Sequence, residues 1–530
     1  MNRPLIALFL SLVATCLSAA ERPNIVLVLA DDLGYSDLGC YGGEIQTPTL
    51  DSLAEGGLRY TQFYNTGRCW PSRAALMTGY YAQQVGMDPK LKTDWPSWTQ
   101  FLPNRLRQAG YRNYLSGKWH LRRLASSAEY AWDRSYQLAD HDRFFSPQDH
   151  YLDAQQLPPV GREEGRYTTV DTTQYAIDFL EEHQRDHADS PFFLYLAYTA
   201  PHFPLHAKAK DIAKYEGRYS EGWDKLRWER QARLEKLGIY QGPLARRQEN
   251  TIAPWSLSQT QLEEQIDPGE LGTAPAWDSL TPEQKAYQAS KMEVHAAMVD
   301  RLDQELARLV AYLKANRKFE NTLFLFLSDN GATAEQINRG DRHLPGAASG
   351  SADSYLALGP GWSTAANTPF SLHKHWNHEG GISSPFIVHW PQSIAANGEL
   401  RRTPAHIVDI VPTLLDIAGI APELPRFGKN LPPLDEAPPL PGLSLTPTFA
   451  HDPEWEPRGL YFHHAGNRAY RRGEWKIVMR REDQTHWALY HLTNDRAERN
   501  NLADTHPDKL AQLVALWEKE ELQYRIDASR

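Results

Sequence analysis

Short apolar runs recur along the chain and predict buried β-strands. Each consists mainly of Ile, Val, Leu and Phe without polar alternation, which is typical of strands in a parallel sheet that is covered on both faces. The first run reads NIVLVLA, and the later ones include FFLYLAY, TLFLFL and PFIVHW. Strands are predicted at residues 24–30, 192–198, 322–327 and 385–390, with a weaker candidate at 111–115.

Segments with apolar residues at helical spacing separate these runs. They predict helices at residues 47–55, 98–108, 172–183 and 281–314. Strands that alternate with helices indicate a sheet sandwiched between two layers of helices. We therefore predict an α/β fold built on one large, mostly parallel (mixed) sheet.

Two further segments depart from this alternation. Residues 205–280 are predicted to form an insertion, helical over 211–237 and irregular over 242–275, which shapes access to a site. A Pro-rich linker is predicted at 422–447. The chain after it predicts a smaller α+β subdomain over 451–530, attached to a main domain over 21–450. Its predicted elements are antiparallel strands at 459–464, 469–471, 475–480 and 487–491 and a helix at 506–523.

Composition and charge narrow the class of protein. Hydrophobic residues make up 41% and charged residues 23% of the 530, which excludes a disordered, collagen-like or coiled-coil chain. The net charge of −10 leaves no basic surplus for a nucleic-acid backbone, so we expect no nucleic-acid partner. A small anionic substrate stays possible, because it needs only a local group of basic residues.

The first twenty residues predict a secretory signal peptide. Arg3 precedes a nearly unbroken apolar stretch over 5–17, and Ser18-Ala19-Ala20 supplies small residues for cleavage. No other run approaches twenty apolar residues, so we expect a secreted or periplasmic protein without a membrane span. The remaining cysteines are Cys40 and Cys69, and a disulfide between them is one expectation for an exported chain.

Polar groups follow four of the predicted strands at their carboxyl ends, where parallel sheets bind ligands. Asp31 and Asp32 follow the first strand, and Asp329 and Asn330 follow the strand at 322–327. These oxygen donors suit Ca²⁺ or Mg²⁺ better than zinc. The other two strands are followed by cationic or proton-transferring groups, Lys118, His120 and His202. A divalent metal beside such groups favours an anionic substrate such as a sulfate or phosphate ester.

A further motif gives the chain a family resemblance. Cys69-Trp70-Pro71-Ser72-Arg73, followed by Leu and Thr-Gly, resembles the sulfatase signature. The segments NIVLVLADDLG, GKWH, TAPHFP, LSDNG, KHWNHEGG and LYHLTNDRAERNNLAD resemble other sulfatase motifs in the same order and span nearly all of the chain after the signal peptide. The resemblance implies the fold of the alkaline-phosphatase superfamily and an activity similar to that of bacterial arylsulfatases.

The same resemblance implies roles for individual residues. Cys69 would be oxidised by a formylglycine-generating maturation enzyme to the nucleophile, whose hydrated aldehyde offers one hydroxyl to attack sulfur and another to expel sulfate. Arg73 would stabilise the ionised diol, and Lys118 and Lys374 would hold sulfate oxygens. His120 would act on the diol and His202 as general acid at the leaving oxygen. The implied ligands of one Ca²⁺ are Asp31, Asp32, Asp329, Asn330 and the modified Cys69.

Several alternatives stay open from the sequence. A phosphodiester or phosphonate monoester hydrolase could use the same fold, metal and modified cysteine, and a non-catalytic binder of sulfated glycans could share the fold. The substrate could be a sulfated polysaccharide, a glycosaminoglycan or an aryl sulfate. Several histidines near Lys374 are further candidates for substrate contacts, namely His343, His373, His375 and His378.

Overall fold

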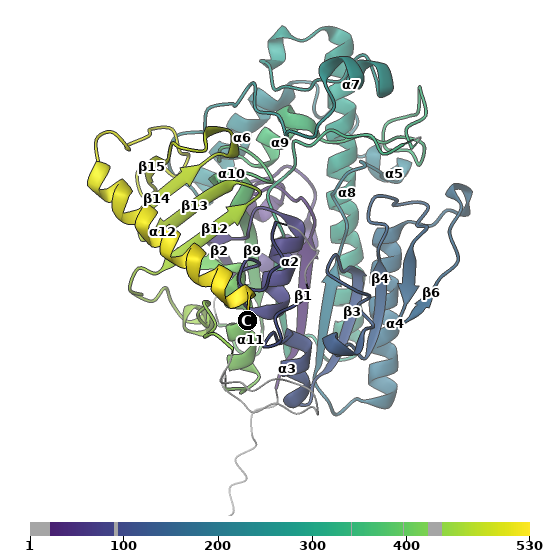
Figure 1. The fold of residues 1–530 in the computed structure, drawn as a ribbon. Helices are drawn as coiled ribbons and strands as arrows, with labels where there is room; N and C mark the ends of the chain where they lie inside the picture. Colours follow the sequence, from purple (N-terminus) through teal and green to yellow (C-terminus); the bar gives the residue numbers. More distant parts are fainter. Residues whose placement is uncertain (1–21, 90–93, 341, 396, 422–436) are drawn as a thin grey trace, which may run out of the picture.

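The structure is a computed structural model that describes residues 22–89, 94–340, 342–395, 397–421 and 437–530. Its largest sheet has eleven strands, in the order β10-β2-β9-β8-β1-β7-β3-β4-β5-β6, with β11 paired to β2 (Figure 1). The strands are β1 Asn24–Ala30, β2 Leu58–Tyr64, β3 Arg112–Lys118, β4 Arg134–Leu138, β5 His150–Leu152, β6 Gln155–Gln156, β7 Phe192–Ala197, β8 Thr322–Ser328, β9 Ser383–His389, β10 Glu399–Arg401 and β11 Ala405–His406.

Strand β1 shows why the apolar runs become central strands. It pairs in parallel with β7 on one side and β8 on the other. Its side chains alternate between two separate hydrophobic cores: Val26 and Val28 join one, and Ile25 and Leu27 join the other. A strand that must be apolar on both faces has no polar positions in its sequence, which explains the unbroken run NIVLVLA.

Helices cover both faces of the sheet, as predicted. Helices α1 (Pro48–Glu55), α4 (Thr168–Asp186) and α8 (Pro282–Ala315) contribute to the core on one face. Helices α2 (Cys69–Thr78), α3 (Leu102–Gln108) and α11 (Ile410–Ile417) contribute to the core on the other. The start of α8 is set by Thr281, whose hydroxyl accepts a hydrogen bond from the backbone N–H of Gln284 at 3.2 Å.

The structure corrects the predicted elements in three respects. Strand β9, predicted as parallel, is antiparallel to both β8 and β2, because burial on both faces gives an apolar run whatever the strand direction. Strands β2 and β4 were not predicted, since LRYTQFY and RSYQL contain too many polar residues for an apolar run. Helix α3 begins only at Leu102, with Pro103 in its first turn, and not at residue 98.

The C-terminal part contains the predicted second sheet. Strands β12 (Gly459–His464), β13 (Asn467–Arg472), β14 (Trp475–Met479) and β15 (Ala488–His491) form it, and all neighbours are antiparallel. Helix α12 (Pro507–Ala528) lies against it, at the left of Figure 1. The indole of Trp517 stacks on Tyr461, and both belong to the core beneath the main sheet. The two sheets therefore share one hydrophobic core. The domain boundary at residue 450 remains a prediction.

Two predictions concern residues that the structure leaves out or describes in part. The signal peptide lies outside the described residues, and so does most of the proposed linker. Among the helices that are described, none combines the length and apolar character that crossing a bilayer requires.

A buried group of charged side chains ties the second sheet to the main one. Lys476 of β14 places its Nζ 2.8 Å from a carboxylate oxygen of Glu379 and 2.8 Å from one of Glu498. Arg496 adds a second cation, with its Nε 2.8 Å from the other oxygen of Glu379. Glu379 begins the short helix α10 (Glu379–Ile382), in the KHWNHEGG segment that carries Lys374. The C-terminal sheet thereby anchors a segment that contributes to the candidate site described below.

We expect Lys476→Ala to destabilise the protein by about 3–5 kcal/mol, because it leaves two buried carboxylates without their shared cation. The midpoint of urea unfolding measures this change. The matched control is Lys519→Ala, since Lys519 lies exposed on α12 of the same subdomain and should change stability by less than about 0.5 kcal/mol. Equal effects of the two substitutions would contradict the anchoring role.

Candidate active site

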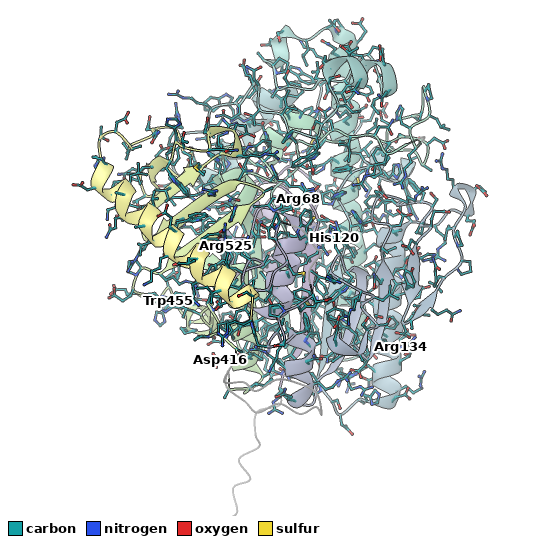
Figure 2. The ribbon with its side chains drawn as sticks, in the orientation of Figure 1. Arg68, His120, Arg134, Asp416, Trp455 and Arg525 are labelled. Atoms are coloured by element: carbon teal, nitrogen blue, oxygen red, sulfur yellow. The ribbon has the colours of Figure 1, made fainter. Side chains whose placement is uncertain are left out.

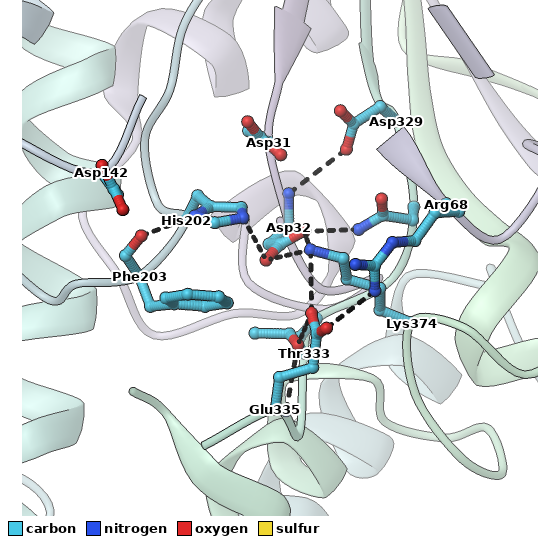
Figure 3. Close-up of polar contacts among 12 residues, drawn as sticks. Asp31, Asp32, Arg68, Asp142, His202, Phe203, Asp329, Thr333, Glu335 and Lys374 are labelled. Atoms are coloured by element: carbon cyan, nitrogen blue, oxygen red, sulfur yellow. Dashed lines mark hydrogen bonds and ion pairs between the residues drawn. The ribbon is translucent and has the colours of Figure 1, made fainter. Parts of the chain in front are cut away.

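The carboxyl ends of β1 and β8 bring four oxygen-donor residues into one buried group (Figure 3). Asp31 and Asp32 follow β1, and Asp329 and Asn330 follow β8. The Asn330 amide donates to Oδ1 of Asp32 at 2.6 Å, and the backbone N–H of Asp32 donates to Oδ1 of Asp329 at 3.4 Å. Asp32 adopts a left-handed φ of 66°, which turns the chain at the strand end.

Three cations surround these acids. Lys118, the last residue of β3, places its Nζ 2.5 Å from Oδ2 of Asp31. The Arg73 guanidinium lies 2.8 Å from Oδ2 of Asp329, and Lys374 lies 2.8 Å from Oδ1 of Asp32. All three cationic side chains are at most 1% exposed. The sequence motifs that carry them are far apart in the chain, and the fold unites them at one sheet edge.

The donor set fits a hard divalent cation. Among the described residues, Oδ1 of Asp31 and Oδ1 of Asn330 are buried without a hydrogen-bond partner. Burial and the neighbouring Asp31 raise the pKa of Asp329 to about 7, against the effect of Arg73. Carboxylates packed this closely need more positive charge to ionise together, and a metal ion would supply it. The acids are also grouped with His202: ligand atoms of Asp31, Asp32 and His202 lie within 4.8 Å of one another.

Cys69 is the first residue of helix α2 and is only 2% exposed. Burial raises the pKa of its thiol, whereas the nearby Lys118 and Lys374 act in the opposite direction. Arg73 lies one helical turn later, so it shares a helix face with Cys69. The alternative considered for Cys69, a disulfide to Cys40, is not formed in this structure, because both cysteines are free and buried.

A third histidine, His141, lies between the two candidate histidines His120 and His202 and contacts both rings. His202 directs its Nε2 toward Oδ2 of Asp32 at 3.7 Å, and its Nδ1 contacts the Phe203 carbonyl at 2.5 Å. The His120 ring lies 4.9 Å from that of His141, which in turn lies 5.4 Å from His202. Burial lowers the pKa of His202 to about 4, despite Asp32, and a bound anion would raise it again.

Sequence reasoning missed two residues of this group, His141 and Glu335. Glu335 holds Lys374 at 3.2 Å and Arg68 at 2.8 Å (Figure 3). Both lie in loops without an apolar period or a metal-like spacing, so no signal in the single sequence marked them.

Of the further histidine candidates, His343 forms hydrogen bonds with the Ile266 carbonyl at 3.1 Å and with the Tyr355 backbone N–H at 3.0 Å. These contacts stabilise the loop structure.

The insertion reaches the candidate site through an indole. Its helices are α5 (Ala209–Ile212), α6 (Gly222–Lys236) and α7 (Gln259–Gln265), and α6 and α7 lie near the top of Figure 1. The segment between α6 and α7 contains Trp255, whose Nε1 donates a hydrogen bond to Glu335 at 2.5 Å. The irregular part of the insertion therefore forms one side of the site.

This site lies within a region that matches a known family. The family model described as Sulfatase matches residues 23–420. A second model, described as N-sulphoglucosamine sulphohydrolase, C-terminal, matches residues 371–525. The first match includes every candidate site residue, and the second includes the whole C-terminal sheet.

Curated relatives agree with the family models. An uncharacterized sulfatase of Schizosaccharomyces pombe is 31% identical, with 94% of this chain and 93% of that protein covered. An arylsulfatase of Klebsiella aerogenes is 30% identical, with 79% and 93% covered. An N-acetylglucosamine-6-O-sulfatase of Bacteroides thetaiotaomicron is 25% identical, with 95% and 87% covered.

Solved structures show the same fold. The protein Ps i-CgsB in complex with k-i-k-neocarrahexaose superimposes with a TM-score of 0.64 at 24% identity, with 94% of this chain and 93% of that chain covered. A protein bound to its substrate D-glucosamine-2-N,6-O-disulfate also gives 0.64, at 21% identity and with 95% and 98% covered. Together with the sequence matches over most of the chain, these findings show that the protein belongs to the sulfatase family and is a sulfuric ester hydrolase.

Proposed function

We propose that the protein releases inorganic sulfate from a carbohydrate or aryl sulfate, with Cys69 converted to formylglycine and one Ca²⁺ held beside it. The observation that carries this proposal is the position of Cys69. It lies at the start of α2, buried and close to Lys118 and Lys374, at the sheet edge that gathers the oxygen donors. A nucleophile placed between cations and a metal site suits an attack on an anionic ester.

The conversion of Cys69 would be made by a formylglycine-generating enzyme in an exported, secreted or periplasmic protein. As a hydrated aldehyde, the side chain would supply one hydroxyl that attacks sulfur and a second that later expels sulfate. Arg73 is placed to stabilise negative charge on that diol, because it is buried on the same face of α2 and lies against Asp329 and Asp31. An unmodified thiol has no second hydroxyl, so it could not complete the cycle.

The four oxygen donors Asp31, Asp32, Asp329 and Asn330 would hold the metal, together with the modified residue 69. Two buried oxygens without a partner, on Asp31 and Asn330, support this assignment. Bound Ca²⁺ would supply positive charge for the sulfate oxygens and for the ionised diol. Within the described part of the chain, only one group of His, Cys, Asp and Glu residues is spaced for a metal ion, which supports a single-metal site.

The remaining site residues would bind the sulfate and move protons. Lys118 and Lys374 would hold sulfate oxygens, since each presents a buried ammonium at the metal cluster. His202 would give a proton to the leaving oxygen: its Nδ1 is held by the Phe203 carbonyl, which leaves Nε2 directed into the site. His120 would act at the diol, on the Trp70 side of Cys69.

Turnover of matched sulfate and phosphate monoesters by the matured protein tests the proposal. Release of sulfate that clearly exceeds release of phosphate supports it. The opposite preference would favour the alternative, a phosphodiester or phosphonate monoester hydrolase. A solved phosphonate monoester hydrolase of Agrobacterium radiobacter shares the fold, but at 17% identity it says nothing about the reaction here. Binding of sulfated glycan without turnover would favour a non-catalytic binder.

We expect His202→Ala to reduce the rate on sugar sulfates about 10²–10⁴-fold, and the rate on 4-nitrophenyl sulfate far less. The reason is that a sugar alkoxide needs a proton to leave, whereas nitrophenolate leaves unaided. The mutant-to-wild-type ratio of kcat/KM on both substrates measures this difference.

The exposed His486 offers a control, since His486→Ala should change neither rate. Equal losses on the two substrates in the His202 variant would indicate a binding or electrostatic role instead of proton donation.

A further inference from the structure

An arginine of the insertion reaches the segment that carries two of the proposed metal ligands. Arg230 lies on α6, and its side chain is fully buried. One terminal nitrogen lies 2.7 Å from Oδ1 of Asp37, and Nε and the other terminal nitrogen donate to the Glu44 carboxylate at 2.8 and 2.9 Å. Both acids belong to the β1–α1 segment (residues 31–47), which begins with the two candidate ligands that follow β1. One guanidinium therefore joins the insertion to this segment at two points.

Helix α6 is itself held by close packing. Helix α9 (Gly359–Ala366) lies against it, and a Cβ on Gly361 would approach the indole of Trp223 to 2.7 Å. In Figure 2, Arg68 and His120 of the candidate site lie between α2 and the insertion helices near the top of the molecule. The tight fit leaves α6 little freedom to move, so a side chain on it can hold a neighbouring segment in place.

Asp37 closes the turn that follows the candidate metal ligands. Its Oδ2 accepts a hydrogen bond from the backbone N–H of Gly34 at 2.9 Å. Asp32, two residues before Gly34, has the left-handed φ of 66°, a conformation that persists only where surrounding contacts hold it. A Cβ on Gly34 would lie 2.4 Å from the carbonyl oxygen of Ala366, so the turn also packs closely against the end of α9. The position of Asp37 therefore affects the backbone that presents Asp32.

The Asp37 carboxylate has two side-chain partners. His295 of α8 places its Nε2 3.0 Å from Oδ2, and Arg230 occupies Oδ1. Burial by itself would raise the pKa of Asp37, but His295 and Arg230 outweigh burial and lower this pKa to about 2. Without Arg230, a fully buried carboxylate would lose its permanent cation, and it would then take up a proton or move toward water. Either change weakens the hydrogen bond to Gly34.

We propose that Arg230 is a positioning residue of the metal site, which acts through Asp37 to hold the β1–α1 segment in the conformation that lets Asp31 and Asp32 bind Ca²⁺. The inference rests on the proposed function, because it presumes that these acids bind the ion. It gives the insertion a second role besides shaping access. Two neighbouring carboxylates repel each other without the ion. A segment that is already held in place loses less freedom when Ca²⁺ binds, so its affinity is higher.

The first test measures the Ca²⁺ affinity of metal-free protein by competition with a chromophoric chelator. We expect Arg230→Met to weaken Ca²⁺ binding about tenfold or more. Arg230→Lys should weaken it less, because lysine keeps the charge but cannot bind Asp37 and Glu44 together. In catalysis, Arg230→Met should raise the Ca²⁺ concentration for half-maximal sulfate release by the same factor, and lower the rate at saturating Ca²⁺ by less than about threefold.

Arg301→Met is the matched control. Arg301 of α8 lies 2.6 Å from Asp211 of the insertion, and both side chains are buried. This pair also joins the insertion to the rest of the fold, but neither partner belongs to the β1–α1 segment. We expect Arg301→Met to lower the urea-unfolding midpoint of the metal-free protein, as Arg230→Met does, and to leave the Ca²⁺ affinity unchanged.

A double variant tests whether Arg230 acts through Asp37. Asp37→Asn by itself should also weaken Ca²⁺ binding, since it removes the carboxylate that Gly34 and Arg230 both contact. If the two side chains act as one unit, the variant that combines Arg230→Met with Asp37→Asn should bind Ca²⁺ about as weakly as the weaker single variant. Independent effects would multiply instead.

The outcomes separate the inference from the proposed function. Unchanged Ca²⁺ affinity in Arg230→Met, an equal loss in Arg301→Met, or multiplying effects in the double variant would overturn the inference while leaving the proposed function intact. If Arg230→Met does not fold, Arg230→Lys and Asp37→Asn provide the same comparison, and unchanged affinity in both would overturn it. A matured wild type that binds no Ca²⁺ would contradict the proposed metal site, and the inference with it.

Discussion

Cys69→Ala is expected to lower sulfate release by at least about 10⁴-fold, to the level of the uncatalysed background. The variant keeps four of the five proposed metal ligands and both lysines, so it should still bind a sulfate ester. It has no group that can attack sulfur. Cys69→Ser should be nearly inactive, or stall as a sulfated enzyme, unless the host's maturation enzyme converts the serine as well. Initial rates on 4-nitrophenyl sulfate and on a sugar sulfate measure the loss.

The matched control is Cys40→Ser, which removes the second thiol of the described chain and should keep most of the activity. Peptide mass spectrometry of the wild type should find residue 69 lighter than a thiol and reactive toward hydrazides. A peptide pair joined between Cys40 and Cys69 in fully active enzyme would overturn the proposed mechanism, and so would full activity of a protein whose Cys69 is an unmodified thiol.

Asp329→Asn is expected to lower both Ca²⁺ affinity and activity by more than about 100-fold. Asparagine keeps the size of the side chain and one carbonyl oxygen, but it removes the negative charge that a hard cation needs. Metal analysis after dialysis measures bound Ca²⁺, and initial rates measure activity. The exposed Asp189 provides a control, since Asp189→Asn should change neither quantity.

The choice of asparagine follows from the contacts of Asp329. Its Oδ2 accepts hydrogen bonds from Nε and a terminal nitrogen of Arg73 at 3.1 and 2.8 Å, and both side chains are fully buried. Asp329→Ala would leave the Arg73 charge with Asp31 alone, at 3.5 Å, and would destabilise the fold as well as the metal site. Full activity of metal-free wild type would contradict the role of the acids as metal ligands.

The central strands and several site residues could be predicted from local sequence. An apolar run such as NIVLVLA shows where a strand lies and where it stops, and the next residue must then stand at the sheet edge. Asp31 and Asp329 were found in this way, because β1 and β8 are neighbours and end together. Predicting these two strand ends required only the local sequence and the assumption of a parallel sheet.

The direction of β9 and the existence of β2 could be established only from the tertiary structure. A strand that is buried on both faces is apolar in either direction, so the run at 383–389 does not encode its antiparallel pairing. Strand β2 has polar residues such as Arg59 and Gln62, which the loops around β10 and the C-terminal sheet satisfy through hydrogen bonds. Their place in a partly buried strand depends on partners that fold onto β2 from distant parts of the chain.

Sequence by itself therefore determined the apolar strands, the acids at their ends and the motif around Cys69, because each depends on residues adjacent in the chain. Only the tertiary structure decided which loop side chains lie around the nucleophile. Glu335, His141 and Trp255 lie in loops without a repeating pattern, and nothing near them in sequence indicates what they contact. Their places are set by how the insertion, the Lys374 segment and the C-terminal sheet pack around one sheet edge, a property of the whole chain and of no single segment.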